Sequence, residues 1–252
     1  MGKILPKKPL ITQRPLKRSI ELVTIQPRRS LPTSINTKFK EIIESLDSGS
    51  QLINLDLSRS QITDAEIKIL AEKLQQNKTV TTLNLHHNFI GPQGAHDLAD
   101  VLKENTTLRN INLECNDISD QGMQYLGNAL SQNKTITTLN LRSNQIRPQG
   151  IEYLAIALQE NTTLRTVKLR SNFIGNLGAR YLATALKQNK TLTTLDLGSN
   201  QIGPQGAQYL IRALDQNNTL TLLNFERNQL DGDVKQRLTE ISQKNSTFKF
   251  LV

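Results

Sequence analysis

Four side chains that could take part in nucleophilic or metal chemistry form two pairs, and the members of each pair are 28 residues apart. His86 and His87 precede Glu114 and Cys115, the only cysteine of the chain, by 28 residues. A cysteine beside a histidine can act as a nucleophile, and imidazole, thiolate and carboxylate all bind zinc. Adjacent strand residues point to opposite faces, however, so His86 and His87 are not expected to share one ion. The sequence suggests no pocket or oxyanion element either. We therefore predict no catalytic residue, no metal site, no cofactor and no enzymatic activity.

Charged side chains recur at the same interval. Arg142 and Arg170 occupy the position of His86 and Glu114, and Lys168 lies two residues before Arg170. Arginine is over-represented at the centres of protein interfaces. These positions favour a partner-binding surface made of His86, Glu114, Arg142, Lys168, Arg170, Asp196, Glu226 and Arg227. The alternative is a set of solvated charges satisfied by Glu114 and water.

These positions belong to a 28-residue repeat. Each copy fits the pattern LxxLxLxxNxI, with Ser60 in place of asparagine in the first copy. The copies start at Leu52, Val80, Leu108, Ile136, Leu164, Leu192 and Leu220. Self-similarity at such a period indicates a stacked repeat architecture.

Two periodicities alternate within each repeat. The segment LNLHH alternates apolar and polar residues, as a half-buried strand does, and Leu98, Ala99 and Leu102 follow at helical spacing. Strand–helix–strand units place parallel strands beside one another through right-handed crossovers. The sequence predicts an α/β solenoid in which parallel strands stack beside one another and alternate with helices. The charged positions would then form columns on one face of the sheet.

The domain organisation follows from where the repeat holds. We predict a basic, proline-containing leader (1–19) and a repeat domain (20–252). The domain would comprise a divergent capping repeat (20–51), seven repeats (52–247) and a terminal strand (248–252). Phe248 and Leu251 match the first two apolar positions of the pattern.

The 28-residue period and the long helix resemble the ribonuclease-inhibitor-like leucine-rich repeats, which also occur in Ran GTPase-activating proteins and innate immune receptors. The match covers residues 52–252 well and 20–51 weakly. The resemblance implies a horseshoe with a parallel concave sheet and convex α-helices, so the charged columns would lie on its concave face. It also implies protein binding, often one that blocks an enzyme by covering its active site. The Asn-, Gln- and Lys-rich repeats are also similar to leucine-rich effectors of intracellular bacterial pathogens.

A second asparagine ends each helical segment and is followed by x-Thr, which matches a glycosylation signal. With no signal peptide in view, we interpret it as a left-handed residue that terminates the helix. The positions are Asn77, Asn105, Asn133, Asn161, Asn189, Asn217 and Asn245. Four tyrosines at 28-residue spacing are predicted to pack one helix on the next: Tyr125, Tyr153, Tyr181 and Tyr209.

Charge and composition limit the partners. The net charge is +9, but residues 1–33 hold eight basic side chains and one acid, so the repeats are nearly neutral. No apolar run approaches the length of a membrane span. We predict a monomer without membrane or nucleic-acid partners, located in the cytoplasm or delivered into a host cell. It would bind a protein, for example an enzyme with acidic residues around its active site, and inhibit or regulate it. GTPase activation of the Ran type, and binding of nucleic acid or an anionic surface through the leader, remain the alternatives.

Overall fold

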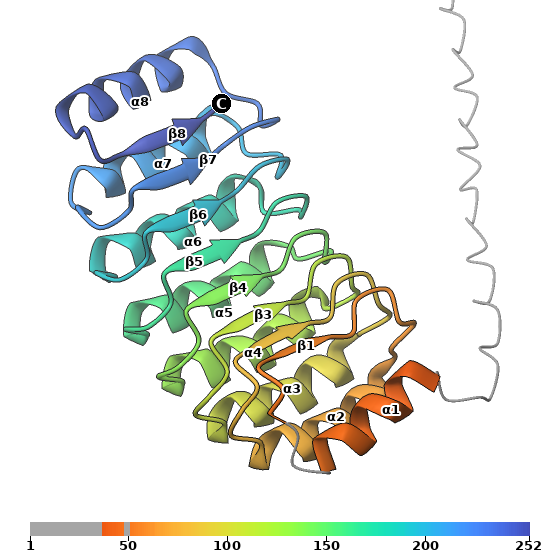
Figure 1. Ribbon diagram of the computed structural model, residues 1–252. Coiled ribbons are helices and arrows are strands. Elements are labelled where there is room, and N and C mark those ends of the chain that lie inside the picture. Colours follow the sequence, from red (N-terminus) through yellow and green to blue (C-terminus); the bar gives the residue numbers. More distant parts are fainter. Residues whose placement is uncertain (1–36, 48–50) are drawn as a thin grey trace, which may run out of the picture. The chain divides into compact units, whose positions relative to one another are not determined.

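The computed structural model describes residues 37–47 and 51–252, which form a stack of strand–helix units (Figure 1). The predicted leader and residues 20–36 of the predicted capping repeat lie outside the described residues. The helices are α1 (Thr37–Asp47), α2 (Asp64–Gln76), α3 (Pro92–Glu104), α4 (Ser119–Gln132), α5 (Pro148–Glu160), α6 (Gly175–Gln188), α7 (Pro204–Leu214) and α8 (Gly232–Lys244). The strands are β1 (Asn54–Asp56), β2 (Thr82–Asn84), β3 (Asn110–Asn112), β4 (Thr138–Asn140), β5 (Thr166–Lys168), β6 (Thr194–Asp196), β7 (Leu222–Asn224) and β8 (Lys249–Leu251). Among the described helices, none is long and apolar enough to span a membrane.

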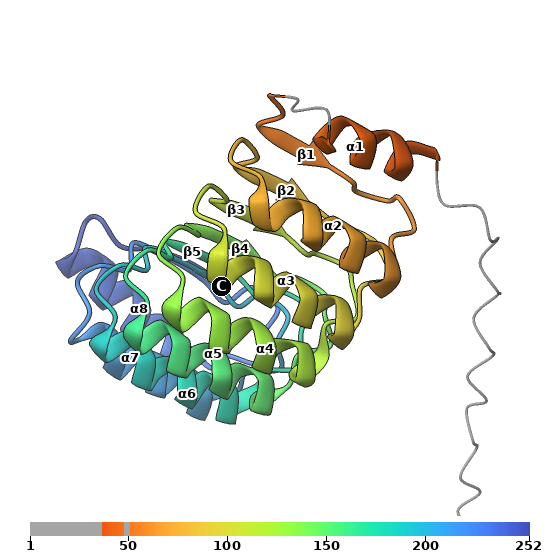
Figure 2. The same cartoon turned by 90° about the horizontal axis from the view of Figure 1, so that it is seen from below.

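The strands form one parallel sheet in chain order, β1 to β8, within the described residues. From β1 to β7 each strand residue pairs with its counterpart one repeat later, as Thr138 pairs with Thr166. Figure 2 shows the helices side by side as the outer layer of the stack. The predicted α/β solenoid of leucine-rich repeats is confirmed.

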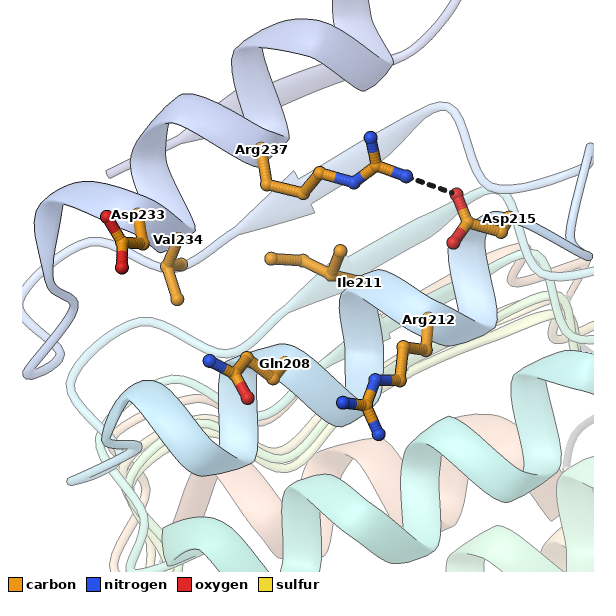
Figure 3. Close-up of a pocket in the computed structure, with 7 residues that line it drawn as sticks. All are labelled: Gln208, Ile211, Arg212, Asp215, Asp233, Val234 and Arg237. Atoms are coloured by element: carbon orange, nitrogen blue, oxygen red, sulfur yellow. Dashed lines mark hydrogen bonds and ion pairs between the residues drawn. The ribbon is translucent and has the colours of Figure 1, made fainter.

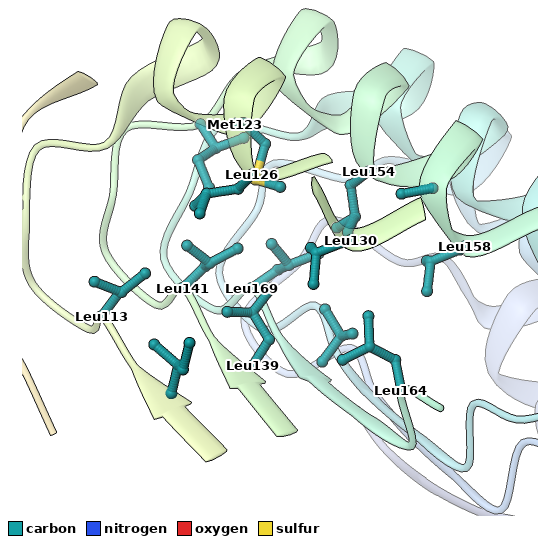
Figure 4. Packing of buried hydrophobic residues seen from close by; sticks show 14 of the residues in the cluster. Leu113, Met123, Leu126, Leu130, Leu139, Leu141, Leu154, Leu158, Leu164 and Leu169 are labelled. Atoms are coloured by element: carbon teal, nitrogen blue, oxygen red, sulfur yellow. The ribbon is translucent and has the colours of Figure 1, made fainter. Parts of the chain in front are cut away.

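The core lies between the sheet and the helices. Leu139 and Leu141 of one repeat face Leu126, Leu130 and Leu154 from the helices, and all five are buried (Figure 4). Burial of each such side chain contributes about 1.5–3 kcal/mol. Because each repeat supplies the same apolar positions, the core continues from one unit to the next.

The start of every second helix is fixed by a polar side chain of the preceding repeat. Asn176 Oδ1 accepts hydrogen bonds from the backbone N–H groups of Gly203 (2.8 Å) and Gly206 (3.0 Å). Two repeats earlier, Asp120 Oδ1 accepts hydrogen bonds in the same way from the backbone N–H groups of Arg147 and Gly150 at the start of α5. A Cβ on Gly206 would lie 2.6 Å from Asn176 Oδ1, so this close approach requires glycine.

The asparagines that end the helices differ from the prediction. Asn161 has φ −74° and ψ 129°, an extended conformation rather than a left-handed one. Its side chain makes the turn: Oδ1 accepts from Thr163 N (2.9 Å) and Leu164 N (2.7 Å), and Nδ2 donates to Leu130 O (2.7 Å) and Asn133 O (3.1 Å). The amide therefore also ties the chain to the preceding repeat, which the backbone of a left-handed residue would not do.

The last strand is shifted by one residue relative to the repeat spacing. Leu222 pairs with Lys249, one residue short of the interval, so Phe250 pairs with Leu223 and Leu251 is exposed rather than buried. In the other strands two successive N–H groups donate to one carbonyl, whereas here only Lys249 donates to Thr221 O. The terminal strand thus begins one residue earlier than the leucine pattern indicates.

Candidate functional site

The inner face of the sheet, which points away from the helices, is positioned by an asparagine that follows each strand from β2 to β7 and is buried after β2 to β6. Asn172 is 2% exposed. Its Oδ1 accepts from Asn144 N and Ile146 N, both at 3.0 Å, and its Nδ2 donates to Leu141 O (3.0 Å) and Leu169 O (2.9 Å). Its amide therefore joins the backbones of successive repeats. The residue before it has a positive φ in every repeat: Arg59, His87, Cys115, Ser143, Ser171, Ser199 and Arg227.

The last residues of β1 to β7 form a polar column on the inner face. Asn84, Asn112 and Asn140 each accept a hydrogen bond from the backbone N–H two residues on, at 3.1–3.2 Å. Neighbouring members also bond sideways, as Asn112 Nδ2 does to Asn84 Oδ1 (3.0 Å). Lys168 occupies this position in β5 and has no side-chain acceptor, so the column is interrupted there.

Two predicted site residues form an ion pair across β3 and β4. Arg142 Nε lies 3.5 Å from Glu114 Oε1, with the arginine side chain 46% exposed. Glu114 Oε2 also accepts from Asn140 Nδ2 (3.0 Å). The carboxylate is therefore held by two partners from the next repeat, while the guanidinium keeps much of its surface open to solvent.

Arg170 points the other way. Its Nη1 lies 2.7 Å from Glu226 Oε2, two strands further on, and its side chain is only 17% exposed. The chain at Gly198 leaves room for this crossing, because a Cβ there would lie 3.0 Å from Arg170 Nη1. Hydrogen bonds from Arg170 and then from Asn224 lower the pKa of the Glu226 carboxyl below its usual value. Arg142 and Arg170 thus diverge instead of forming one basic cluster.

The remaining predicted residues differ in their surroundings. Lys168 and Arg227 are exposed, and no ion pair joins Lys168 to any residue that the structure describes. Asp196 pairs with Lys168 in the sheet register, but its carboxylate accepts from Gly198 N (3.0 Å). Sequence reasoning missed Gly198, although a glycine in a column of charged residues was a signal for a crossing side chain.

His86, Glu114 and Cys115 come together on the inner face near β2 and β3. One donor atom from each lies within 4.8 Å of those of the other two, and all three residues are half-buried. His86 Nδ1 is the one buried side-chain nitrogen or oxygen without a hydrogen-bond partner in the described part of the chain. His87 is exposed, with its ring centroid 5.6 Å from that of His86.

A pocket of about 370 Å³ opens between α7 and α8 on the outer layer (Figure 3). Arg237 crosses it to Asp215 at 3.3 Å. Val234 occupies the position that is glycine in α3 to α7, for example Gly206, and α8 does not approach α7 as closely as α2 to α7 approach one another. The pocket is a consequence of this looser packing.

Comparisons with known proteins agree with the repeat. The family model described as "Leucine Rich repeat" matches residues 76–99, 104–127, 132–155, 160–183 and 188–210. The chain therefore contains leucine-rich repeats. Domains of this kind generally mediate protein–protein interaction and are typically non-enzymatic.

Two solved structures are similar to the chain, each at 17% sequence identity. The tropomodulin C-terminal domain of Caenorhabditis elegans has a TM-score of 0.52 and covers 60% of this chain and 93% of that one. Leiomodin-1 Actin-Binding Site 2 has a TM-score of 0.38, over 82% of this chain and 89% of that one. The first likeness supports the fold alone. Among curated proteins, none matches the chain.

Proposed function

We propose that this chain binds a partner protein on the inner face of the sheet, at a surface centred on Lys168. The observation that carries the proposal is the interruption of the polar column. Each of the other strands from β1 to β7 ends in an amide or carboxylate that accepts the backbone N–H two residues on, whereas β5 ends in an exposed lysine that has no acceptor for it. The neighbouring side chains of the column stabilise the fold by accepting backbone hydrogen bonds. The Lys168 side chain makes no such bond, so it can contact a partner without loss to the fold.

The charge around Lys168 defines the partner. Arg170 and Glu226 neutralise one another, and Glu114 takes up part of the charge of Arg142. What remains for a partner is the ammonium of Lys168, with Asp196 beside it on β6, the open side of the Arg142 guanidinium and the exposed Arg227. These suit an acidic surface, and such contacts speed association and fix its orientation more than they add affinity. An enzyme with carboxylates around its active site would be inhibited by a protein docked there.

A charge reversal tests the proposal. We expect Lys168→Glu to abolish capture of the partner from lysate, whereas Lys134→Glu, an exposed lysine between α4 and β4, should leave it unchanged. Retained proteins are identified by mass spectrometry, and circular dichroism checks that both variants fold. A partner retained equally by both variants would place the interface elsewhere. The retained protein's enzymatic activity, assayed with and without the chain, then tests inhibition.

A further inference from the structure

We infer that His86, Glu114 and Cys115 form a Zn²⁺ site on the inner face of the sheet. The three donors are an imidazole nitrogen, a carboxylate oxygen and a sulfur, which are the ligand types that zinc prefers. The chain holds three histidines and one cysteine in total, and the fold places one of the former beside the latter and beside a carboxylate.

The distances suit a tetrahedral ion after small side-chain rotations. Zinc–ligand bonds of about 2.0–2.3 Å place neighbouring donors about 3.4–3.7 Å apart in a tetrahedron. The present donors lie within 4.8 Å of one another, so they need to close by about an ångström. All three side chains are only half-buried, which leaves them room to do so.

The imidazole is unsatisfied without a ligand. His86 Nδ1 is buried and lacks a hydrogen-bond partner among the described residues. A buried polar atom without a partner destabilises the fold. A bound cation would accept a free electron pair of this ring. No group among the described residues donates a hydrogen bond to it.

Neighbouring residues prepare the carboxylate and set the net charge. Asn140 and Arg142 hold the two oxygens of Glu114, as outer partners of metal ligands do. With Cys115 as the thiolate, whose proton leaves to solvent on binding, the two ligand charges exceed the single charge of Arg142. Three protein ligands leave a fourth position for water or for a donor from a bound partner.

Cobalt(II) provides the direct test, because a thiolate–cobalt bond gives a charge-transfer band in the near ultraviolet. We expect the purified chain to show this band on Co²⁺ titration and Zn²⁺ to remove it by displacement. Cys115→Ser should abolish the band. His86→Ser and Glu114→Gln should each weaken Zn²⁺ binding, measured by competition, by at least the roughly tenfold that loss of an outer partner costs.

The variants are chosen to fold. Serine occupies the position of His86 at Ser58, and the position of Cys115, with the same positive φ, at Ser143 and Ser171. His96→Gln, on α3, is the control and should bind as the unaltered chain does. If excess Co²⁺ gives no band, the site does not exist. If His86→Ser and Glu114→Gln titrate like His96→Gln, the metal binds the thiol alone and the proposal is wrong. Neither readout depends on the protein partner.

Discussion

At the scale of single residues, the buried asparagine after each strand couples successive turns. Replacing Asn172 with alanine removes an acceptor for two backbone N–H groups and a donor to two carbonyls. Buried groups left without partners cost about 1–3 kcal/mol each, less where water can enter. We expect Asn172→Ala to lower the free energy of unfolding by about 2–5 kcal/mol.

Urea denaturation followed by circular dichroism measures this loss. Asn128→Ala is the matched control, because Asn128 is exposed on α4 and alanine favours helices. Equal midpoints for the two variants would mean that the buried amide does not hold the turns together.

The Arg170–Glu226 pair predicts a pH dependence. We expect Arg170→Gln to raise the pKa of Glu226 toward its ordinary value of 4.5, because the guanidinium that favours the carboxylate is gone. Since the folded pKa is lowered, the pair stabilises the fold above the pH at which an unfolded glutamate titrates. That contribution is lost as the pH falls through the lowered pKa.

An NMR titration of the Glu226 carboxyl carbon compares the unaltered chain with the variant. Arg237→Gln should instead raise the pKa of Glu240, to which Arg237 is hydrogen-bonded, and leave Glu226 unchanged. A Glu226 pKa that is the same with and without Arg170 would show that the pair does not form in solution.

The sequence predicted which residues share the inner face, because their position in the repeat determines the direction of each side chain. It named Glu114 as a partner of the basic side chains only in the alternative to a binding surface, and it did not predict Glu226 as the partner of Arg170. Arg142 and Arg170 occupy the same position in adjacent repeats, yet one contacts Glu114 and the other crosses Gly198 to Glu226. Such choices depend on side chains one or two strands away and follow no periodic rule. The asparagines after the helices were misread for a related reason, since asparagine can turn a chain either through its backbone or through its amide.

At the scale of elements, glycines at the helix starts set the spacing between helices. A Cβ on Gly206 would lie 2.8 Å from the Cα of Asn176, and backbone cannot move aside locally. We expect Gly206→Ala to lower the free energy of unfolding by about 1–3 kcal/mol, as overpacking does. A Cβ on Gly232, at the start of α8, would meet no other atom within 4 Å. Gly232→Ala should therefore be neutral or stabilise by up to about 1 kcal/mol.

Thermal unfolding of both variants distinguishes the two sites. A loss of similar size for both would attribute the effect to backbone conformation rather than to helix spacing. The elements themselves were predicted from periodicity, since each repeat shows the same change from strand to helix spacing. The looser packing of α8 was not predicted, because it follows from single substitutions such as Val234 in place of glycine.

At the scale of the whole repeat array, each unit contacts mainly its neighbours, so stability varies along the stack. β3 and β5, which carry the proposed metal and partner sites, each have strands on both sides. α8, in contrast, buries only Val234 and Leu238, whereas α5 buries six residues. The proposed sites therefore lie in repeats that pack against a neighbouring repeat on each side.

Hydrogen exchange tests this gradient. We expect the amides of α8 to exchange faster than those of α5, because opening α8 exposes less apolar surface and breaks contact with one neighbouring helix instead of two. Mass spectrometry of peptides from the two helices measures the difference. Equal protection would mean that the array opens as one unit, and Zn²⁺ bound near β3 or a partner bound at β5 would then slow exchange as far away as α8. With the expected gradient, either ligand should protect the central repeats while α8 continues to open on its own.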